Sequence, residues 1–391
     1  MAIIPEALYE DIRSGNSVLF AGAGVSTEGG PYGKPTFYDH ILEKSGYPRP
    51  EDRPPFPDLM QYYCDHVDGG LKNRLTREII WRIEEFSAPG EIHSTTTAFH
   101  RLTARIPFFN RVVTTNWDPF FEQAMNVLVA MVEDRDVPFW DDGKRQVLKI
   151  HGCVTRPYTM VATRIDYDQC ADNNHLVFTK LKDLVATKTF IYVGFSMGDP
   201  DFKIVLDEII ERLGRFKKLS YAIDPSASPE TQKEWEARQI RIIKAAGVGF
   251  MYELVDCLIR DGILVSTDYL AFLQEQHEKI VRAHFELDQS ESDGAFASAM
   301  YQDGVDHVLV AALSGSLLGR SKDAYEHDLS EATRTLRLQR KKNNPIEIAH
   351  WSGRVEVLRR FCSEDTTDIP AYFDPQKLEP SHRYVKWGSS R

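Results

Sequence analysis

Polar side chains that can support acid–base chemistry follow directly on apolar runs of this chain. Asn116 and Asp118 come after the β-branched run Arg111–Thr115, and His151 comes after the run Val147–Ile150. An asparagine offers a carbonyl acceptor and an amide donor, which suits it to position a water molecule or a hydroxyl group. A histidine accepts a proton at neutral pH because its unperturbed pKa is about 6.5. These residue types are the candidates for catalysis.

A glycine turn follows the apolar run that begins at Val18. Gly22 and Gly24 let the backbone turn sharply and approach a ligand closely. Free backbone N–H groups at such a turn, next to the capping residue Ser26, suit a pyrophosphate. The spacing nearly matches the dinucleotide fingerprint G-x-G-x-x-G, except at its last glycine. Taken alone, this stretch fits a phosphate-binding loop and a plain tight turn about equally well.

The elements that must position these residues are alternating strands and helices. Strands are expected at 17–21, 111–115, 147–150, 160–162, 189–193, 219–223 and 247–251, and helices at 5–15, 36–44, 59–67, 70–86, 94–106, from 119 onward, and at 175–187, 201–212 and 229–244. Because the strands are apolar on both sides, we expect an α/β fold with a parallel sheet and helices on both faces. Ligands bind beyond the carboxyl ends of such strands. Those ends are polar, small or glycine, namely residues 22–26, 116–118, 151–152, 194–196 and Asp224. This coincidence favours nucleotide binding.

The strand signals disappear from about Tyr269 onward. Helices are expected at 269–287, 295–319, 321–343 and 345–362, so we divide the chain into an α/β domain (1–264) and a mostly helical domain (265–391). The helical part is rich in apolar residues, namely Leu270, Leu273, Ile280, Val281, Leu309, Val310, Leu313, Leu317 and Leu318. Burial within the domain is one use for them. The generous supply predicts a homo-oligomer built partly through this domain.

Composition narrows the class of protein. The formal net charge of −11 argues against general affinity for nucleic acid. No apolar run approaches the roughly 20 residues that span a bilayer, so we expect no membrane partner and a cytoplasmic location. The five cysteines are scattered and never form a C-x-x-C pair, which speaks against a zinc ribbon and a disulfide framework. His100 lies in an amphipathic helical pattern, which indicates a core residue rather than a ligand.

Together the motifs resemble those of the sirtuin superfamily, over roughly residues 15–255. Gly22-Ala23-Gly24-Val25-Ser26 is similar to its first signature, and Thr114-Thr115-Asn116-Trp117-Asp118 to its T-Q-N-I-D signature with Thr115 in place of glutamine. Ile150-His151-Gly152 is similar to its catalytic histidine–glycine pair, Gly194-Phe195-Ser196 to its later G-T-S motif, and Asp224 falls near the motif that closes on adenosine. The resemblance implies a Rossmann-like fold that binds NAD. It implies catalytic roles for Asn116, His151 and Asp118, and NAD contacts from Gly22, Ala23, Gly24, Ser26, Thr115, Gly194, Phe195, Ser196 and Asp224.

The departures from the family pattern point away from protein deacylation. The paired cysteines of the deacylase zinc site are missing, so no zinc is expected, and Gly30–Phe37 replaces the family's G-I-P-D-F-R stretch. What remains is similar to the bacterial sirtuin-like NAD hydrolases of anti-phage defence, and most like the subunit that pairs with a HerA-type ATPase. The alternatives are a nucleotide-binding sensor or scaffold with little catalysis, and an NAD-dependent deacylase.

Overall fold

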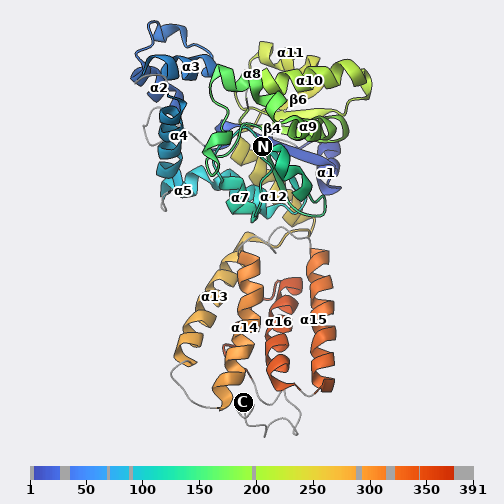
Figure 1. Cartoon of the computed structure of the whole chain (residues 1–391). Coiled ribbons are helices and arrows are strands. Elements are labelled where there is room, and N and C mark those ends of the chain that lie inside the picture. Colours follow the sequence, from blue (N-terminus) through green and yellow to red (C-terminus); the bar gives the residue numbers. More distant parts are fainter. Residues whose placement is uncertain are drawn as a thin grey trace. The chain divides into compact units, whose positions relative to one another are not determined.

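The structure is a computed structural model of the chain, and it describes residues 4–26, 36–67, 71–87, 91–195, 200–287, 293–313, 322–342 and 344–373. The chain divides into two compact units, Met1–Leu254 and Val255–Arg391 (Figure 1). The boundary lies within a helix, α12 (Gly247–Arg260), about ten residues before the expected division at 264.

The first unit is built on a six-stranded parallel sheet in the order β3-β2-β1-β4-β5-β6. The strands are β1 (Ser17–Ala21), β2 (Arg111–Thr114), β3 (Gln146–Lys149), β4 (Thr189–Val193), β5 (Ser220–Ile223) and β6 (Ile240–Ile243). Leu19 of β1 pairs with Val112 on one side and with Ile191 on the other. The strand order therefore reverses at β1, and the crevice beyond the ends of β1 and β4 is where such sheets bind ligands.

Helices precede and connect these strands. In the first unit they are α1 (Glu6–Arg13), α2 (Phe37–Ser45), α3 (Phe56–His66), α4 (Lys72–Ser87), α5 (Glu91–Thr96), α6 (Ala98–Arg105), α7 (Phe120–Met125), α8 (Arg164–Asn173), α9 (His175–Thr187), α10 (Pro200–Leu213), α11 (Pro229–Ala237) and most of α12. One face of the sheet, including Phe20 and Tyr192, packs against buried residues of α8–α11 such as Leu181 and Leu206. Residues of the opposite face, such as Leu19 and Ile191, are also fully buried. The predicted parallel sheet with both faces covered is confirmed.

Four local predictions were wrong. Residues 160–162 form no strand, and the helix expected at 94–106 is divided into α5 and α6. The helix expected at 229–244 ends at Ala237, because Gln239 takes a left-handed conformation (φ 58°) before β6 begins. Residues 247–251, expected as the last strand, begin helix α12 instead.

A small helical layer of the first unit comprises α2, α3 and α4 and lies beside the sheet (Figure 1). Its core joins Ile41 of α2, Leu59 and Tyr63 of α3, and Leu75 and Ile79 of α4. Trp117, which follows β2, packs against the same cluster. This layer therefore meets the sheet at the carboxyl end of β2.

The second unit is helical over its described residues, with α13 (Thr267–Leu287), α14 (Asp293–Leu313), α15 (Lys322–Lys342) and α16 (Pro345–Ser363). Its core begins at Val265 and includes Leu273, Ile280 and Leu309. A Cβ at Gly304 of α14 would overlap the backbone of α16 at His350, so these two helices touch directly. Many of the apolar residues noted in the sequence are thus used inside the unit, while Leu317 and Leu318 lie outside the described residues.

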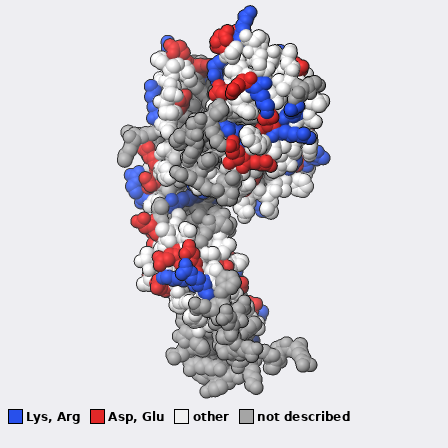
Figure 2. All heavy atoms as spheres, turned by 90° about the vertical axis from the view of Figure 1, so that its left-hand side faces the viewer, with Lys and Arg blue, Asp and Glu red and all other residues white. Residues whose placement is uncertain are grey.

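The surface carries both signs of charge. On the face drawn in Figure 2, Lys and Arg residues alternate with Asp and Glu residues over the described parts of the chain. None of the helices in these parts has the length and apolarity needed to span a bilayer.

Candidate functional site

A cavity of about 700 Å³ opens at the carboxyl ends of β1, β2 and β4. Its wall contains nine of the residues selected from the sequence, namely Gly22, Ala23, Ser26, Thr115, Asn116, Asp118, His151, Gly194 and Phe195. Its size falls within the range typical of small-molecule sites. The structure thus brings together segments more than a hundred residues apart in the sequence.

Three of the selected residues stand apart from this wall. Gly24 lies behind it, packed on Gly194. The carboxylate of Asp224 accepts hydrogen bonds from the backbone N–H and hydroxyl of Ser226 (2.8 and 3.1 Å), which closes a turn after β5 outside the cavity wall. Ser196 lies outside the described residues.

The two glycine turns after β1 and β4 pack backbone against backbone. A Cβ on Gly24 would lie 2.8 Å from the Cα of Gly194, and a Cβ on Gly22 would overlap the carbonyl of Gly194. The backbone N–H of Gly22 donates to the carbonyl of Val193, and that of Gly24 donates to the carbonyl of Gly194, both at a distance of 3.0 Å. These two donors therefore join the turns to each other, whereas the sequence had suggested that they face a pyrophosphate.

Asn116 is held rigidly at the end of β2. Its backbone N–H donates to the hydroxyl of Thr114 (3.0 Å), and its Nδ2 donates to the carbonyl of Gly22 (3.2 Å). The side chain is buried, with the residue only 6% exposed, and Oδ1 has no hydrogen-bond partner among the described residues. Because Asn116 lines the cavity, this oxygen is an acceptor suited to a water molecule or a ligand hydroxyl.

Asp118 lies beside Asn116 and is also buried. Its Oδ2 accepts a hydrogen bond from the hydroxyl of Ser26 (3.2 Å), and its Oδ1 accepts one from the backbone N–H of Phe120 (3.2 Å). These contacts fix the carboxylate at the cavity wall. A fixed carboxylate there favours a ligand group that carries positive charge.

A buried ion pair supports this segment from behind. Lys149, the last residue of β3, is fully buried, and its Nζ lies 3.1 Å from Oε1 of Glu122 and donates to the carbonyl of Asp118. Burial acts to lower the pKa of Lys149, but the neighbouring Glu122, Cys153 and Asp118 together outweigh it, so the pKa is raised. Lys149 thus stays charged and ties β3 to the segment that carries Asn116 and Asp118.

His151 follows β3 and is 2% exposed. Its Nδ1 lies 3.5 Å from the hydroxyl of Tyr167, and the two rings meet edge to face with centroids 4.8 Å apart. Gly152 next to it has φ +84°, and a Cβ there would overlap the backbone of Thr159. Glycine is therefore required for the chain to turn at His151 and pack against the following loop.

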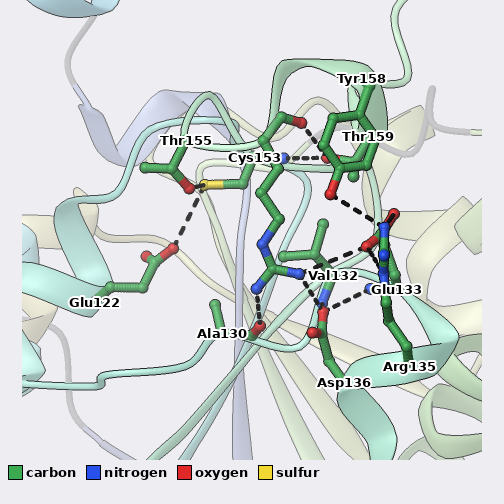
Figure 3. A network of polar contacts seen from close by, with 11 residues as sticks. Glu122, Ala130, Val132, Glu133, Arg135, Asp136, Cys153, Thr155, Tyr158 and Thr159 are labelled. Carbon is green, nitrogen blue, oxygen red and sulfur yellow. Dashed lines mark hydrogen bonds and ion pairs between the residues drawn. The ribbon is translucent and has the colours of Figure 1, made fainter.

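A polar network anchors that loop, as Figure 3 shows. The backbone N–H of Cys153 donates to the hydroxyl of Thr159 (3.1 Å), and the guanidinium of Arg156 donates to Asp136 (2.6 Å). Asp136 also accepts from the backbone N–H of Val132 (2.9 Å). These bonds join the loop after His151 to the segment before β3, so the position of His151 is fixed from both sides.

Sequence reasoning missed the rest of the cavity wall. Helix α4 contributes Ile79, Arg82, Ile83 and Phe86 to it, and the lining also includes the aromatic residues Phe37, Tyr38, Phe56 and Tyr167. The helical spacing of Ile79, Ile83 and Phe86 indicates an apolar face. Nothing in that spacing tells a face that lines a cavity from one that fills a core.

Comparison with known proteins agrees with this geometry. The family model described as "SIR2-like domain" matches residues 110–243, which include Asn116, Asp118 and His151. This segment is similar to a SIR2-like domain. The resemblance to the sirtuin superfamily inferred from the motifs is thereby confirmed, and the SIR2-like match covers β2 through β6.

Relatives of this chain are known from several bacteria. It is 26% identical over 219 residues to the "NAD(+) hydrolase ThsA" of Bacillus cereus (strain MSX-D12). This match covers 55% of this chain and 44% of that protein. The ThsA of Enterococcus faecium is 28% identical over 213 residues, covering 53% and 42%. "Defense-associated sirtuin 2" of Bacillus subtilis is 24% identical over 267 residues, covering 62% and 24%. The chain thus spans less than half the length of these relatives.

The described residues contain no group of three or more His, Cys, Asp or Glu that could hold a metal ion. Independence from zinc stays a prediction.

Proposed function

We propose that the chain is an NAD glycohydrolase that cleaves NAD to ADP-ribose and nicotinamide. The observation that carries the proposal is that Asn116, Asp118 and His151 line one cavity at the carboxyl edge of the sheet. The names of the ThsA relatives support the same substrate. The defence-associated relative supports a role in anti-phage defence by depletion of NAD.

Asn116, His151 and Asp118 would each have a separate role in the cleavage of NAD. The bond from the ribose C1′ to nicotinamide breaks with its electron pair on nicotinamide, which leaves as a neutral molecule and leaves an oxocarbenium ion behind. A water molecule then attacks C1′ and loses a proton. Oδ1 of Asn116 suits the orientation of that water or of a ribose hydroxyl, and His151 is the group to accept the proton. The Asp118 carboxylate suits the positive charge of the pyridinium ring and of the developing cation.

Two alternatives remain. A nucleotide-binding sensor or scaffold would use the same cavity without chemistry, but it would not need an asparagine and a histidine positioned on one wall. An NAD-dependent deacylase would need an acylated peptide as co-substrate, and the zinc ribbon of such enzymes has no counterpart in this sequence.

Regulation is part of the proposal, because uncontrolled cleavage of NAD would harm the cell that makes the enzyme. We assign control to the helical unit, which would form a homo-oligomer and dock a HerA-type ATPase in the cytoplasm. Exposed apolar residues of this unit, Val310, Leu338 and Ile346, offer contact area. Light scattering after size-exclusion chromatography tests the assembly, by comparing the full chain with one that ends at Leu264. If the full chain and the shortened chain are both monomeric, the proposed oligomer is contradicted. If both bind the ATPase equally well, the docking site lies outside the helical unit.

One experiment tests the activity. The purified chain is incubated with NAD, with and without an acetylated peptide, and the products are resolved by chromatography. We expect ADP-ribose and nicotinamide in both mixtures. Cleavage that requires the peptide would favour the deacylase, and binding of NAD without cleavage would favour the sensor.

A further inference from the structure

The cavity contains one Lys or Arg side chain among its described lining residues, Arg82 of α4. The same wall contains one carboxylate, that of Asp118. An NAD molecule carries a positive pyridinium ring at one end and a negatively charged pyrophosphate in its middle. Asp118 suits the first charge, so the second charge requires a donor or a cation elsewhere in the cavity.

The glycine turn is poorly placed to supply that donor. In dinucleotide-binding sheets the backbone N–H groups after β1 receive the pyrophosphate. Here the N–H groups of Gly22 and Gly24 already donate to Val193 and Gly194, and that of Val25 donates to the carbonyl of Gly22 (3.2 Å). A phosphate that reached this turn would compete with bonds that hold β1 and β4 together.

The side chain of Arg82 is largely, though not fully, withdrawn from solvent. Its side chain is only 11% exposed, and its guanidinium lies 4.8 Å from the ring centre of Phe86, another wall residue. It pairs with Glu85 over 2.9 Å, and Glu85 does not line the cavity. The planar guanidinium presents five N–H donors, a geometry that matches phosphate oxygens in pairs. Glu85 and Phe86 therefore orient a phosphate-matching group at the cavity.

We propose that Arg82 binds a phosphate of the dinucleotide and sets the preference of the site for phosphorylated ligands. The assignment rests on the proposed function, since it takes NAD as the ligand of this cavity. Arg82 would lower the KM for NAD by binding the substrate and the transition state alike, so its loss would change KM more than kcat. The competing explanation is a structural pair of Arg82 and Glu85 that only stabilises α4.

The test compares three variants of the full chain with the wild type. Arg82→Gln removes the charge and keeps a polar, shorter side chain. Arg82→Lys keeps the charge but lacks the planar guanidinium. Arg77→Gln removes an exposed arginine from the same helix, away from the cavity wall. Calorimetry measures the affinity for ADP-ribose, which has two phosphates, and for nicotinamide riboside, which has none. Steady-state kinetics give KM and kcat for NAD at low and high salt.

We expect Arg82→Gln to weaken ADP-ribose binding and to raise the KM for NAD, each by about tenfold to a hundredfold. This is the usual effect of losing a charge-assisted hydrogen bond. Affinity for nicotinamide riboside should stay unchanged, Arg82→Lys should recover part of the loss, and Arg77→Gln should match the wild type. The assignment would be overturned if Arg82→Gln weakened the binding of ADP-ribose and of nicotinamide riboside equally, or weakened the binding of neither. A wild-type chain that neither binds ADP-ribose nor cleaves NAD would instead overturn the proposed function and the assignment with it.

Discussion

The side-chain amide of Asn116 donates to the carbonyl of Gly22 over 3.2 Å, which joins the end of β2 to the glycine turn after β1. A carbonyl can only accept, so this bond requires the NH₂ group of Asn116 to face Gly22. The oxygen Oδ1 is therefore left as the acceptor of the side chain at the cavity. The same contact that stabilises the sheet edge thus fixes the orientation of the proposed catalytic amide.

Replacing Asn116 by alanine should abolish NAD cleavage while the fold persists. The loss in kcat is expected to be about a hundredfold or more, because the group that orients the nucleophile is gone. The lost bond to Gly22 should cost about 1 kcal/mol of unfolding free energy. Asn110→Ala, a change just before the opposite end of β2, is the matched control and should remain active. Wild-type turnover by Asn116→Ala would remove this residue from the mechanism.

His151→Ala should be comparably inactive, with about a hundredfold or greater loss in kcat, and adding it to Asn116→Ala should cost little more, since both groups serve one step. Tyr167→Phe should cost less than about tenfold, because a 3.5 Å contact with Nδ1 is a long hydrogen bond. Initial rates for the two single variants, the double variant and Tyr167→Phe check this. Fully additive losses, or inactivity of Tyr167→Phe, would contradict the assignment.

The sheet could be predicted from the sequence because its central strands are continuous apolar runs. Val18–Ala21 and Thr189–Val193 are buried on both faces, which leaves a run with no polar alternation. The edge strand β6 is only partly buried and gave no such signal, so residues 240–243 were placed in a helix. Gly247–Met251 resembles a strand until the pattern is continued to Leu254 and Leu258, where helical spacing becomes evident.

The cavity could be predicted only in part. Strand ends converge for a general topological reason, so Asn116 and His151 were found together. Arg82 could not be found, because it reaches the site through the tertiary packing of α4 and its neighbours carry an ordinary amphipathic pattern. The hydrogen bonding of Gly22 and Gly24 to the β4 turn also depends on a contact made across more than 160 residues.

Lys149→Met should destabilise the first unit by about 3–5 kcal/mol, since it leaves the largely buried carboxylate of Glu122 without its cation. Adding Glu122→Gln should recover most of this loss. Because the pKa of Lys149 is raised in the folded state, its contribution is fully present below the unfolded pKa and is lost as pH rises through the folded value. Denaturant unfolding of the single and double variants measures the effect. Equal stability of Lys149→Met and the wild type would contradict it.

The buried imidazole of His100 should lower the free energy of unfolding at acidic pH. It is fully buried, with its ring 4.4 Å from that of Phe121, and burial lowers its pKa from 6.5 to about 4. As pH falls below about 6.5, His100 binds a proton in the unfolded chain but stays neutral in the folded chain. Folding stability therefore decreases until about pH 4. At about 1.4 kcal/mol per unit, the total loss is about 3 kcal/mol. Urea unfolding over this pH range measures it. In His100→Leu this part of the pH dependence should vanish, whereas the exposed control His175→Leu should follow the wild type. Parallel curves for His100→Leu and the wild type would show that His100 takes up its proton equally in both states.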